Sequence, residues 1–277
     1  MSNEATAATM TFVVYVDDAS IAREAAERSQ ALVEKHRARL VLVDATEDPS
    51  LSPEDRQAFV RERLVPGIPS VLFWAGKESI GDPNFLALNA VVDSLVLDSS
   101  RGSGGIEALR QLIEYFSQGR RYKVQDLAYL RLAPWQEMIA GFFDDPELAG
   151  DLRTIERVSI AAGSPAEQYY LLGWLASRLQ WKPGSVTYTL GSRGKPRRIY
   201  DVALTSAGTT YRAALQNDDE RIVCLTVEGA HAREMHCDTL HDISVVALAE
   251  QAILQPQTSD VYRATLEAAR AILERTQ

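Results

Sequence analysis

Four continuous apolar runs alternate with amphipathic segments in the first 119 residues, and this alternation constrains the fold more than any other feature of the chain. The apolar runs lie at 12–16, 40–43, 71–74 and 95–97, and the helical patterns at 20–35, 53–64, 83–90 and 105–117. Continuous apolar runs are typical of parallel strands that are buried on both faces. Strands that alternate with helices form right-handed crossovers in an open sheet. Residues 1–119 are therefore predicted to form a Rossmann-like α/β domain, an open parallel sheet with helices on both faces.

The pattern changes after a basic stretch at 119–123, where we place the domain boundary. Residues 134–179 have an apolar pattern typical of helices, with interruptions at two proline-containing turns. Further on, the apolar period becomes two in four segments, at 186–190, 198–204, 209–215 and 222–227. Two more helices are predicted at 243–254 and 259–275. Residues 120–277 are thus predicted to form an α+β domain, a helical segment followed by an antiparallel meander.

The composition of the chain argues against several classes of protein. The chain has 277 residues and a formal net charge of −9, which argues against nucleic-acid binding, because phosphate neutralisation needs a basic surface. It contains no apolar run long enough to span a membrane, and its first residues do not have the pattern of a signal peptide. We therefore expect a cytoplasmic protein without a membrane partner. Its two cysteines are too few for a disulfide framework.

The residues after the first predicted strand do not fit a dinucleotide site. Such a site needs a glycine-rich turn between the first strand and the first helix. The residues at that turn are Asp17, Asp18, Ala19 and Ser20, and the two carboxylates would repel a pyrophosphate. We therefore predict no cofactor.

The segment at 98–105 is the best candidate for binding a phosphate. It connects the end of a predicted strand to the start of a helix, where backbone N–H groups favour an anion. Ser99, Ser100 and Arg101, followed by three glycines, could surround a sugar phosphate. One alternative function is therefore a sugar-phosphate-binding enzyme or sensor that uses Ser99–Gly105, and the simpler interpretation is a flexible, serine-capped connection.

A second polar cluster consists of His231, His236, Cys237 and His241. Imidazole and thiolate are zinc ligands. The spacing fits neither a Cys-x-x-Cys knuckle nor a His-Glu-x-x-His helix, and the segment is predicted to run from the end of a strand through a loop. We therefore predict solvated histidines and no metal, and keep a metal sensor as an alternative.

The four tryptophans divide into two predicted groups. Trp135 and Trp174 lie within apolar helical patterns and are predicted to be core residues. Trp74 at a strand end and Trp181 at a helix end are expected to be partly exposed. Because exposed aromatic residues are frequent at interfaces, these two are candidates for partner binding, with ordinary packing as the alternative.

A basic segment interrupts the acidic chain at 194–198. Lys195, Arg197 and Arg198 lie at the tip of a predicted hairpin, where they could steer an acidic partner towards the protein. The alternative is a solubilising loop. No Ser-His-Asp or Cys-His set with a recognisable context occurs in the sequence, so we expect a protein that is not an enzyme.

Five segments resemble sequence motifs of a known family, and they occur along the chain in the same order as in that family. They are DLAYLRLAPW at 126–135, LLGWLASRL at 171–179, IPSVLFW at 68–74, DSLVLDSS at 93–100 and DVYRATL at 260–266. These segments are similar to those of the OpcA family, the glucose-6-phosphate dehydrogenase assembly proteins, although Tyr129 replaces the family's usual tryptophan. The resemblance implies a non-catalytic regulator that binds glucose-6-phosphate dehydrogenase and promotes its active oligomer in the oxidative pentose phosphate pathway.

The resemblance also bears on the two cysteines. Cyanobacterial members of the OpcA family respond to redox conditions through C-terminal cysteines, which makes Cys224 and Cys237 redox candidates and a thiol sensor another alternative. From the sequence alone, Cys224 on a predicted strand is more simply a small hydrophobic residue. Cys237 lies beside His236 and would have a lowered pKa if exposed.

Overall fold

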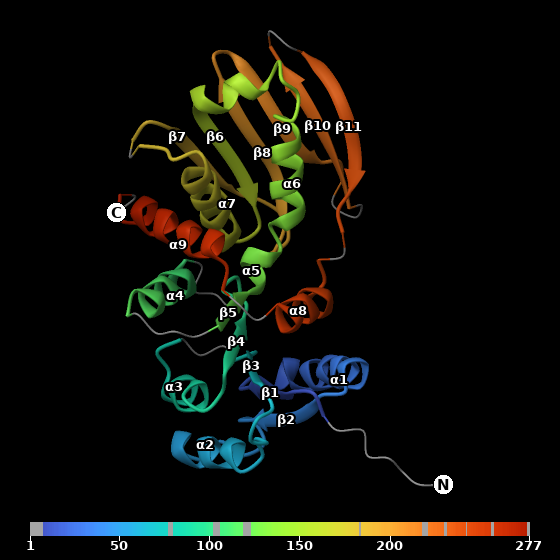
Figure 1. Cartoon of the computed structure of the whole chain (residues 1–277), viewed down its shortest axis with the longest axis vertical. Helices are drawn as coiled ribbons and strands as arrows, with labels where there is room; N and C mark the ends of the chain where they lie inside the picture. The colour runs from blue at the N-terminus through green and yellow to red at the C-terminus, as the bar shows by residue number, and fades with distance from the viewer. Residues whose placement is uncertain are drawn as a thin grey trace. The chain divides into compact units, whose positions relative to one another are not determined.

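The computed structural model describes residues 8–76, 80–101, 106–118, 123–182, 184–217, 221–229, 232–241, 243–255 and 258–275. The chain divides into two compact units, each built around its own sheet (Figure 1). Unit 1 comprises Met1–Leu127 and Ser244–Thr258, and unit 2 comprises Ala128–Ile243 and Ser259–Gln277. No helix among the described residues is long and apolar enough to cross a membrane.

Unit 1 contains the predicted parallel sheet. Its strands are β1 (Thr11–Val16), β2 (Arg39–Asp44), β3 (Ser70–Trp74), β4 (Ser94–Leu97) and β5 (Lys123–Asp126). They pair in parallel in the order β2-β1-β3-β4-β5. The helices are α1 (Ala19–His36), α2 (Pro53–Arg61), α3 (Pro83–Asn89), α4 (Glu107–Ser117) and α8 (Val245–Leu254). The predicted fold class is confirmed, and the Ser52–Asp55 capping box at the start of α2 is present.

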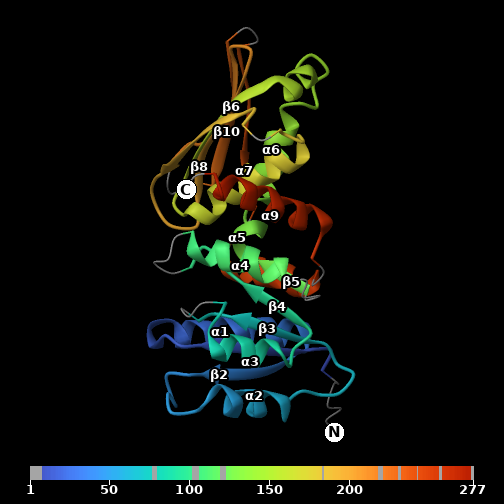
Figure 2. The same ribbon diagram turned by 90° about the vertical axis from the view of Figure 1, so that its left-hand side faces the viewer.

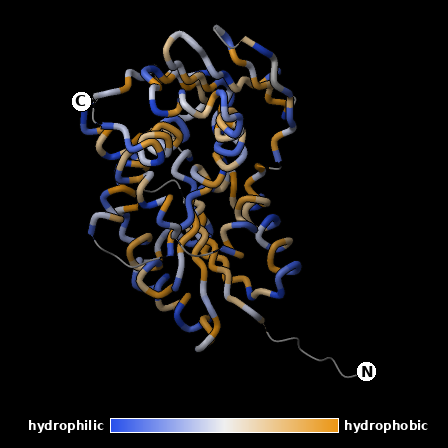
Figure 3. The backbone as a smooth tube through the Cα atoms, turned by 45° about the horizontal axis from the view of Figure 1, so that its top comes forward, coloured by the Kyte–Doolittle hydropathy of each residue, from blue (hydrophilic) through white to orange (hydrophobic). Residues whose placement is uncertain are grey.

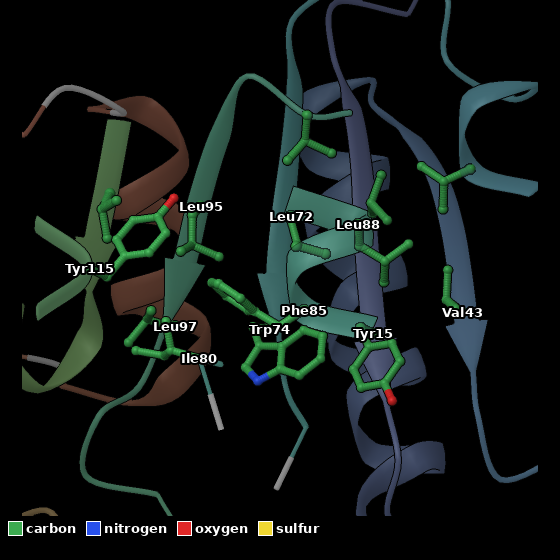
Figure 4. Packing of buried hydrophobic residues seen from close by; sticks show 14 of the residues in the cluster. Tyr15, Val43, Leu72, Trp74, Ile80, Phe85, Leu88, Leu95, Leu97 and Tyr115 are labelled. Carbon is green, nitrogen blue, oxygen red and sulfur yellow. The ribbon is translucent and has the colours of Figure 1, made fainter. Parts of the chain in front are cut away.

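The core of unit 1 explains why β1, β3 and β4 are almost continuously apolar. Side chains from β1, β3 and β4 pack against α2, α3 and α4, and Figure 3 shows the hydrophobic colouring along these strands. Tyr15 and Trp74 are stacked with their ring centroids 4.1 Å apart, and Phe85 meets Trp74 edge-on (Figure 4). Trp74 is only 5% exposed, so the expectation that it is partly exposed is wrong. Its stacking on Tyr15 keeps the indole inside the core.

The division of the chain differs from the predicted boundary at residue 119. β5 pairs with β4 and extends the first sheet, and α8 also belongs to unit 1. α8 is held by its neighbours: the Glu250 carboxylate lies 2.6 Å from the Lys35 ammonium and 2.9 Å from the His36 ring on α1. The hydrogen bond from Lys35, with that from His36, lowers the pKa of the Glu250 carboxyl group. Sequence periodicity identified α8 as a helix but carried no information about which unit it joins.

Unit 2 contains a six-stranded sheet. Its strands are β6 (Ile155–Ala162), β7 (Thr187–Ser192), β8 (Ile199–Ser206), β9 (Thr209–Leu215), β10 (Ile222–Glu228) and β11 (Arg233–Thr239). The order is β11-β10-β9-β8-β6-β7, antiparallel except for the parallel pair β6–β7. The helices are α5 (Leu127–Leu130), α6 (Ala133–Gly141), α7 (Pro165–Arg178) and α9 (Asp260–Leu273), with a 3₁₀ turn at Ala149–Thr154. The antiparallel meander is confirmed for β8, β9 and β10, but β7, predicted to be its first strand, pairs in parallel with β6 instead. The helical pattern expected in 134–179 is wrong at β6, and the loop expected after β10 is wrong at β11.

Helices cover one face of this second sheet. Figure 2 shows α6, α7 and α9 together on one side of the strands. α7 and α9 approach closely at Gly173, where an added Cβ would lie 2.6 Å from the Thr265 carbonyl oxygen. Trp135 on α6 is 1% exposed, as predicted for a core residue. Trp174 is only half-buried, so its assignment to the core is wrong: Gly173 makes the close contact with α9, and Trp174 is the next residue round the helix.

Candidate functional site

In an open α/β fold, ligands bind beside the carboxyl ends of the parallel strands, and we call this end of the sheet the carboxyl edge. Here β1 is followed by Asp17 and Asp18. The Asp18 carboxylate accepts hydrogen bonds from the Ser20 amide at 3.0 Å and the Ser20 hydroxyl at 2.8 Å, so it caps α1. An added Cβ at Gly76 would lie 2.8 Å from Asp17 Oδ2. Carboxylates therefore occupy the turn in which a dinucleotide fold uses glycines.

The predicted phosphate loop begins at the end of β4. The Ser99 amide donates to Asp126 Oδ1 at 3.0 Å, and both of these residues are almost fully buried. The Ser100 amide and hydroxyl donate to Asp98 Oδ1 at 3.2 and 2.5 Å, and the Arg101 guanidinium donates to the Ala75 carbonyl at 3.1 Å. The remainder of the loop, 102–105, lies outside the described residues. The donors that would receive a phosphate are thus turned towards carboxylate and carbonyl oxygens, and phosphate binding here stays a prediction.

The basic segment 193–198 lies in a different setting from the one predicted. It does not turn a hairpin, because β7 and β8 lie on opposite sides of β6. The segment therefore crosses the end of β6 and the start of α7. We call it the basic loop, and its four cationic side chains are Arg193, Lys195, Arg197 and Arg198.

Backbone hydrogen bonds fix the basic loop in place. The Lys195 amide donates to the Tyr200 hydroxyl at 2.6 Å, and the Arg197 amide donates to Ser164 Oγ at 2.8 Å. The Gly163 amide donates to the Arg198 carbonyl at 2.7 Å. An added Cβ at Gly163 would overlap the Lys195 carbonyl group, so only glycine fits under the loop.

Two guanidinium groups of the basic loop lie over one aromatic ring. Arg193 and Arg198 place their Cζ atoms 5.5 and 5.9 Å from the centroid of the Tyr200 ring. Arg193 and Lys195 are exposed, and Arg197 and Arg198 are half-buried. A positive surface held by its own backbone loses little conformational freedom on binding, which favours recognition of an acidic surface.

The histidine and cysteine cluster is divided between the two faces of β11. Cys237 forms a disulfide with Cys224, directly opposite on β10, so neither is a free thiol, and the simpler interpretation of Cys224 as only a small hydrophobic residue is wrong. A redox role for this pair stays a prediction. His236 and His241 line a pocket together with residues of α6. His231 lies outside the described residues. Within the described part of the chain, no three His, Cys, Asp or Glu side chains are grouped so that they could hold a metal ion.

Two features of these sites were missed by sequence reasoning. The first is the clamp formed by Ser164 and Tyr200 on the basic loop, which depends on β6 lying between β7 and β8. The second is the pocket beside β11, which depends on a strand that was expected to be a loop. Trp181, the other aromatic candidate, is half-buried just beyond α7, and its role in partner binding stays a prediction.

Solved structures share the fold at low sequence identity. KijD10, a 3-ketoreductase from Actinomadura kijaniata in complex with NADP, is 12% identical over 94% of this chain and 95% of its own, with a TM-score of 0.54. Levoglucosan dehydrogenase in complex with NADH and L-sorbose is 12% identical over 96% of both chains, with a TM-score of 0.50. The fold and the carboxyl edge together define a class: an α/β protein with a Rossmann-like first unit, a second mixed sheet, and carboxylates in place of the glycine-rich turn.

Sequence comparisons identify the family. The family described as the C-terminal domain of the glucose-6-phosphate dehydrogenase subunit matches residues 122–266. The OxPP cycle protein OpcA of Nostoc punctiforme is 38% identical over 44% of this chain, and that of Synechocystis sp. is 34% identical over 48%. These matches cover 26% and 28% of the relatives' own lengths, so the chain matches only about a quarter of each. The chain belongs to the OpcA family.

Proposed function

We propose that this protein is a non-catalytic, cytoplasmic regulator that binds glucose-6-phosphate dehydrogenase and promotes its active oligomer. The observation that carries the proposal is the match of 122–266 to a domain that the family description assigns to glucose-6-phosphate dehydrogenase. The names of the relatives support a role in the OxPP cycle, which we take to be the oxidative pentose phosphate pathway. The carboxylates after β1 support a role other than dinucleotide chemistry.

The mechanism follows from binding linkage. A protein that binds the active assembly of an enzyme better than the inactive form shifts the population by the ratio of the two affinities. It needs no reacting groups of its own. It does need a docking surface that is already ordered before the enzyme binds. The basic loop provides one, because hydrogen bonds of its backbone hold it in place.

The first prediction concerns stoichiometry. Purified protein should retain the purified dehydrogenase of the same organism in a pull-down, and its effect on dehydrogenase activity should saturate as it is titrated in. The effect should weaken as the enzyme becomes more concentrated, because a concentrated enzyme assembles unaided. An effect that occurs at substoichiometric amounts and persists after the protein is removed would show a modifying enzyme instead.

The second prediction concerns the basic loop. Replacing Lys195, Arg197 and Arg198 by serine, asparagine and serine should slow association with the dehydrogenase about tenfold at low salt, since steering charges act mainly on the encounter rate. Asparagine is chosen at 197 because φ is +62° there, a conformation that asparagine tolerates. The salt dependence of association, measured by stopped-flow or surface-based kinetics, should flatten in parallel.

A matched control removes the same charge elsewhere in unit 2. Serine at Arg263, Arg270 and Arg275 on and just beyond α9 also removes three positive charges, from an exposed helix face. This control should associate nearly as fast as the parent protein. Equal slowing by both triple variants would assign the effect to net charge, and no slowing by the loop variant would exclude the basic loop from docking.

A further inference from the structure

In the part of the chain that the structure describes, no strand pairs with the outer edge of β11, so we call this the free edge of the second sheet. β11 is the outermost strand of the order β11-β10-β9-β8-β6-β7, and Figure 1 shows it at the margin of unit 2. Cys224 and Cys237 lie opposite one another with their Cα atoms 4.0 Å apart, a separation typical of a non-hydrogen-bonded pair. The N–H and C=O groups of Cys237 therefore point away from β10, towards the free edge. A strand edge of this kind can pair with another extended segment.

A pocket of about 180 Å³ lies beside this edge, on the face that carries α6. α6 contributes Pro134, Glu137, Met138 and Gly141, whose spacing places them on one side of the helix. The sheet side is formed by residues of β10 and β11 and of the segment after β11, namely Leu225, His236, Asp238, Thr239, Leu240 and His241. Because side chains alternate along a strand, His236 and Asp238 face the pocket, while Cys237 and the disulfide face the opposite side of the sheet. We call this space between α6 and β11 the edge groove.

The lining of the edge groove specifies the chemistry of an occupant. Met138, Leu225 and Leu240 provide apolar surface, and Glu137 and Asp238 are exposed carboxylates. Among the described residues that line the groove there is neither a lysine nor an arginine. At the other end of β11, the Arg233 guanidinium pairs with Asp145 at 2.5 Å. The groove thus suits a side chain with an apolar stem and a positive end, such as lysine or arginine.

We propose that the edge groove binds an extended, basic segment of the dehydrogenase, which adds as a strand to β11. Main-chain hydrogen bonds to the free edge would supply affinity, and an alternate side chain of the segment would enter the groove and contact Glu137 and Asp238. The proposal rests on the proposed function for the identity of the partner. It is separate from the basic loop, which requires an acidic surface on the same enzyme.

The first test fills the groove. An added Cβ at Gly141 meets no atom within 4 Å, so Gly141→Phe can place a ring in the groove without displacing backbone. Gly150 lies outside the groove and is equally open, so Gly150→Phe is the matched control. With purified dehydrogenase as the probe, Gly141→Phe should weaken binding at least tenfold in titration calorimetry, and Gly150→Phe should bind like the parent protein. Unchanged thermal melting of both variants would verify their folding.

The second test reverses one charge. Glu137→Lys should weaken binding of the dehydrogenase several-fold, whereas Glu267→Lys on the exposed face of α9 should not. Hydrogen–deuterium exchange supplies an independent measurement, because strand addition should protect the Cys237 amide in the complex. The parent protein, Gly141→Phe and Glu137→Lys could all bind the dehydrogenase equally well, without protection of the Cys237 amide. That result would overturn the proposal that the edge groove binds the enzyme, and it would leave the proposed function intact. Failure of the parent protein to bind would overturn the proposed function itself.

Discussion

Trp135→Ala should destabilise unit 2 by about 3–5 kcal/mol, the usual cost of truncating a large aromatic side chain in a core. Trp135 is the largest of the fully buried side chains, with 1% of its surface exposed, and its removal leaves a cavity beneath α6. Chemical denaturation followed by circular dichroism measures the change in the free energy of unfolding.

Trp174→Ala is the matched comparison, because it removes the same side chain from a half-buried position on α7. The loss of stability should be clearly smaller than for Trp135→Ala. Equal losses for the two variants would contradict the burial difference. A Trp174→Ala variant that melts like the parent protein but loses the dehydrogenase would assign Trp174 to the interface.

The fold of unit 1 was predictable because its local signals agree with one another. The apolar runs of β1, β3 and β4 are buried on both faces, and the run of β2, at the edge of the sheet, alternates between buried and partly exposed residues. Asp18, Ser52 and Asp82 each begin a helix by accepting a hydrogen bond from a backbone amide in its first turn. The edge of the sheet was harder to predict. β5 has the sequence KVQD and lacks the apolar run of the other strands, and α8 reaches unit 1 from more than a hundred residues further along the chain.

The sequence pattern did not predict two strands of unit 2, β6 and β11, and the reasons differ. β6 has the sequence IERVSIAA, whose apolar residues fit a helical spacing as well as a strand, and only its pairing with β7 and β8 decides between them. β11 is polar because it lies at the edge of the sheet, and a register shift interrupts its pairing with β10 after Leu225. Both candidate docking sites depend on these strands, so their positions could not be inferred from the sequence.

Two residues of a segment that carries the family resemblance have a structural role in unit 2. Arg131 and Trp135 both lie in the DLAYLRLAPW segment, and both are buried. The Arg131 guanidinium lies 2.6 Å from Glu167 Oε1 on α7, with 4% and 0% of the two side chains exposed. The pair therefore joins the chain segment before α6 to the first turn of α7.

Arg131→Met should destabilise unit 2 by about 3–5 kcal/mol, because it leaves the Glu167 carboxylate buried without the guanidinium. The double variant Arg131→Met/Glu167→Leu replaces both charges by apolar side chains and should recover most of the lost stability. Denaturant unfolding of the parent protein, both single variants and the double variant forms a double-mutant cycle that isolates the coupling between the two side chains. Destabilisation of the double variant by the sum of the two single changes would mean that the pair contributes through packing alone. Recovery would instead show that the buried charge is what makes each single change costly.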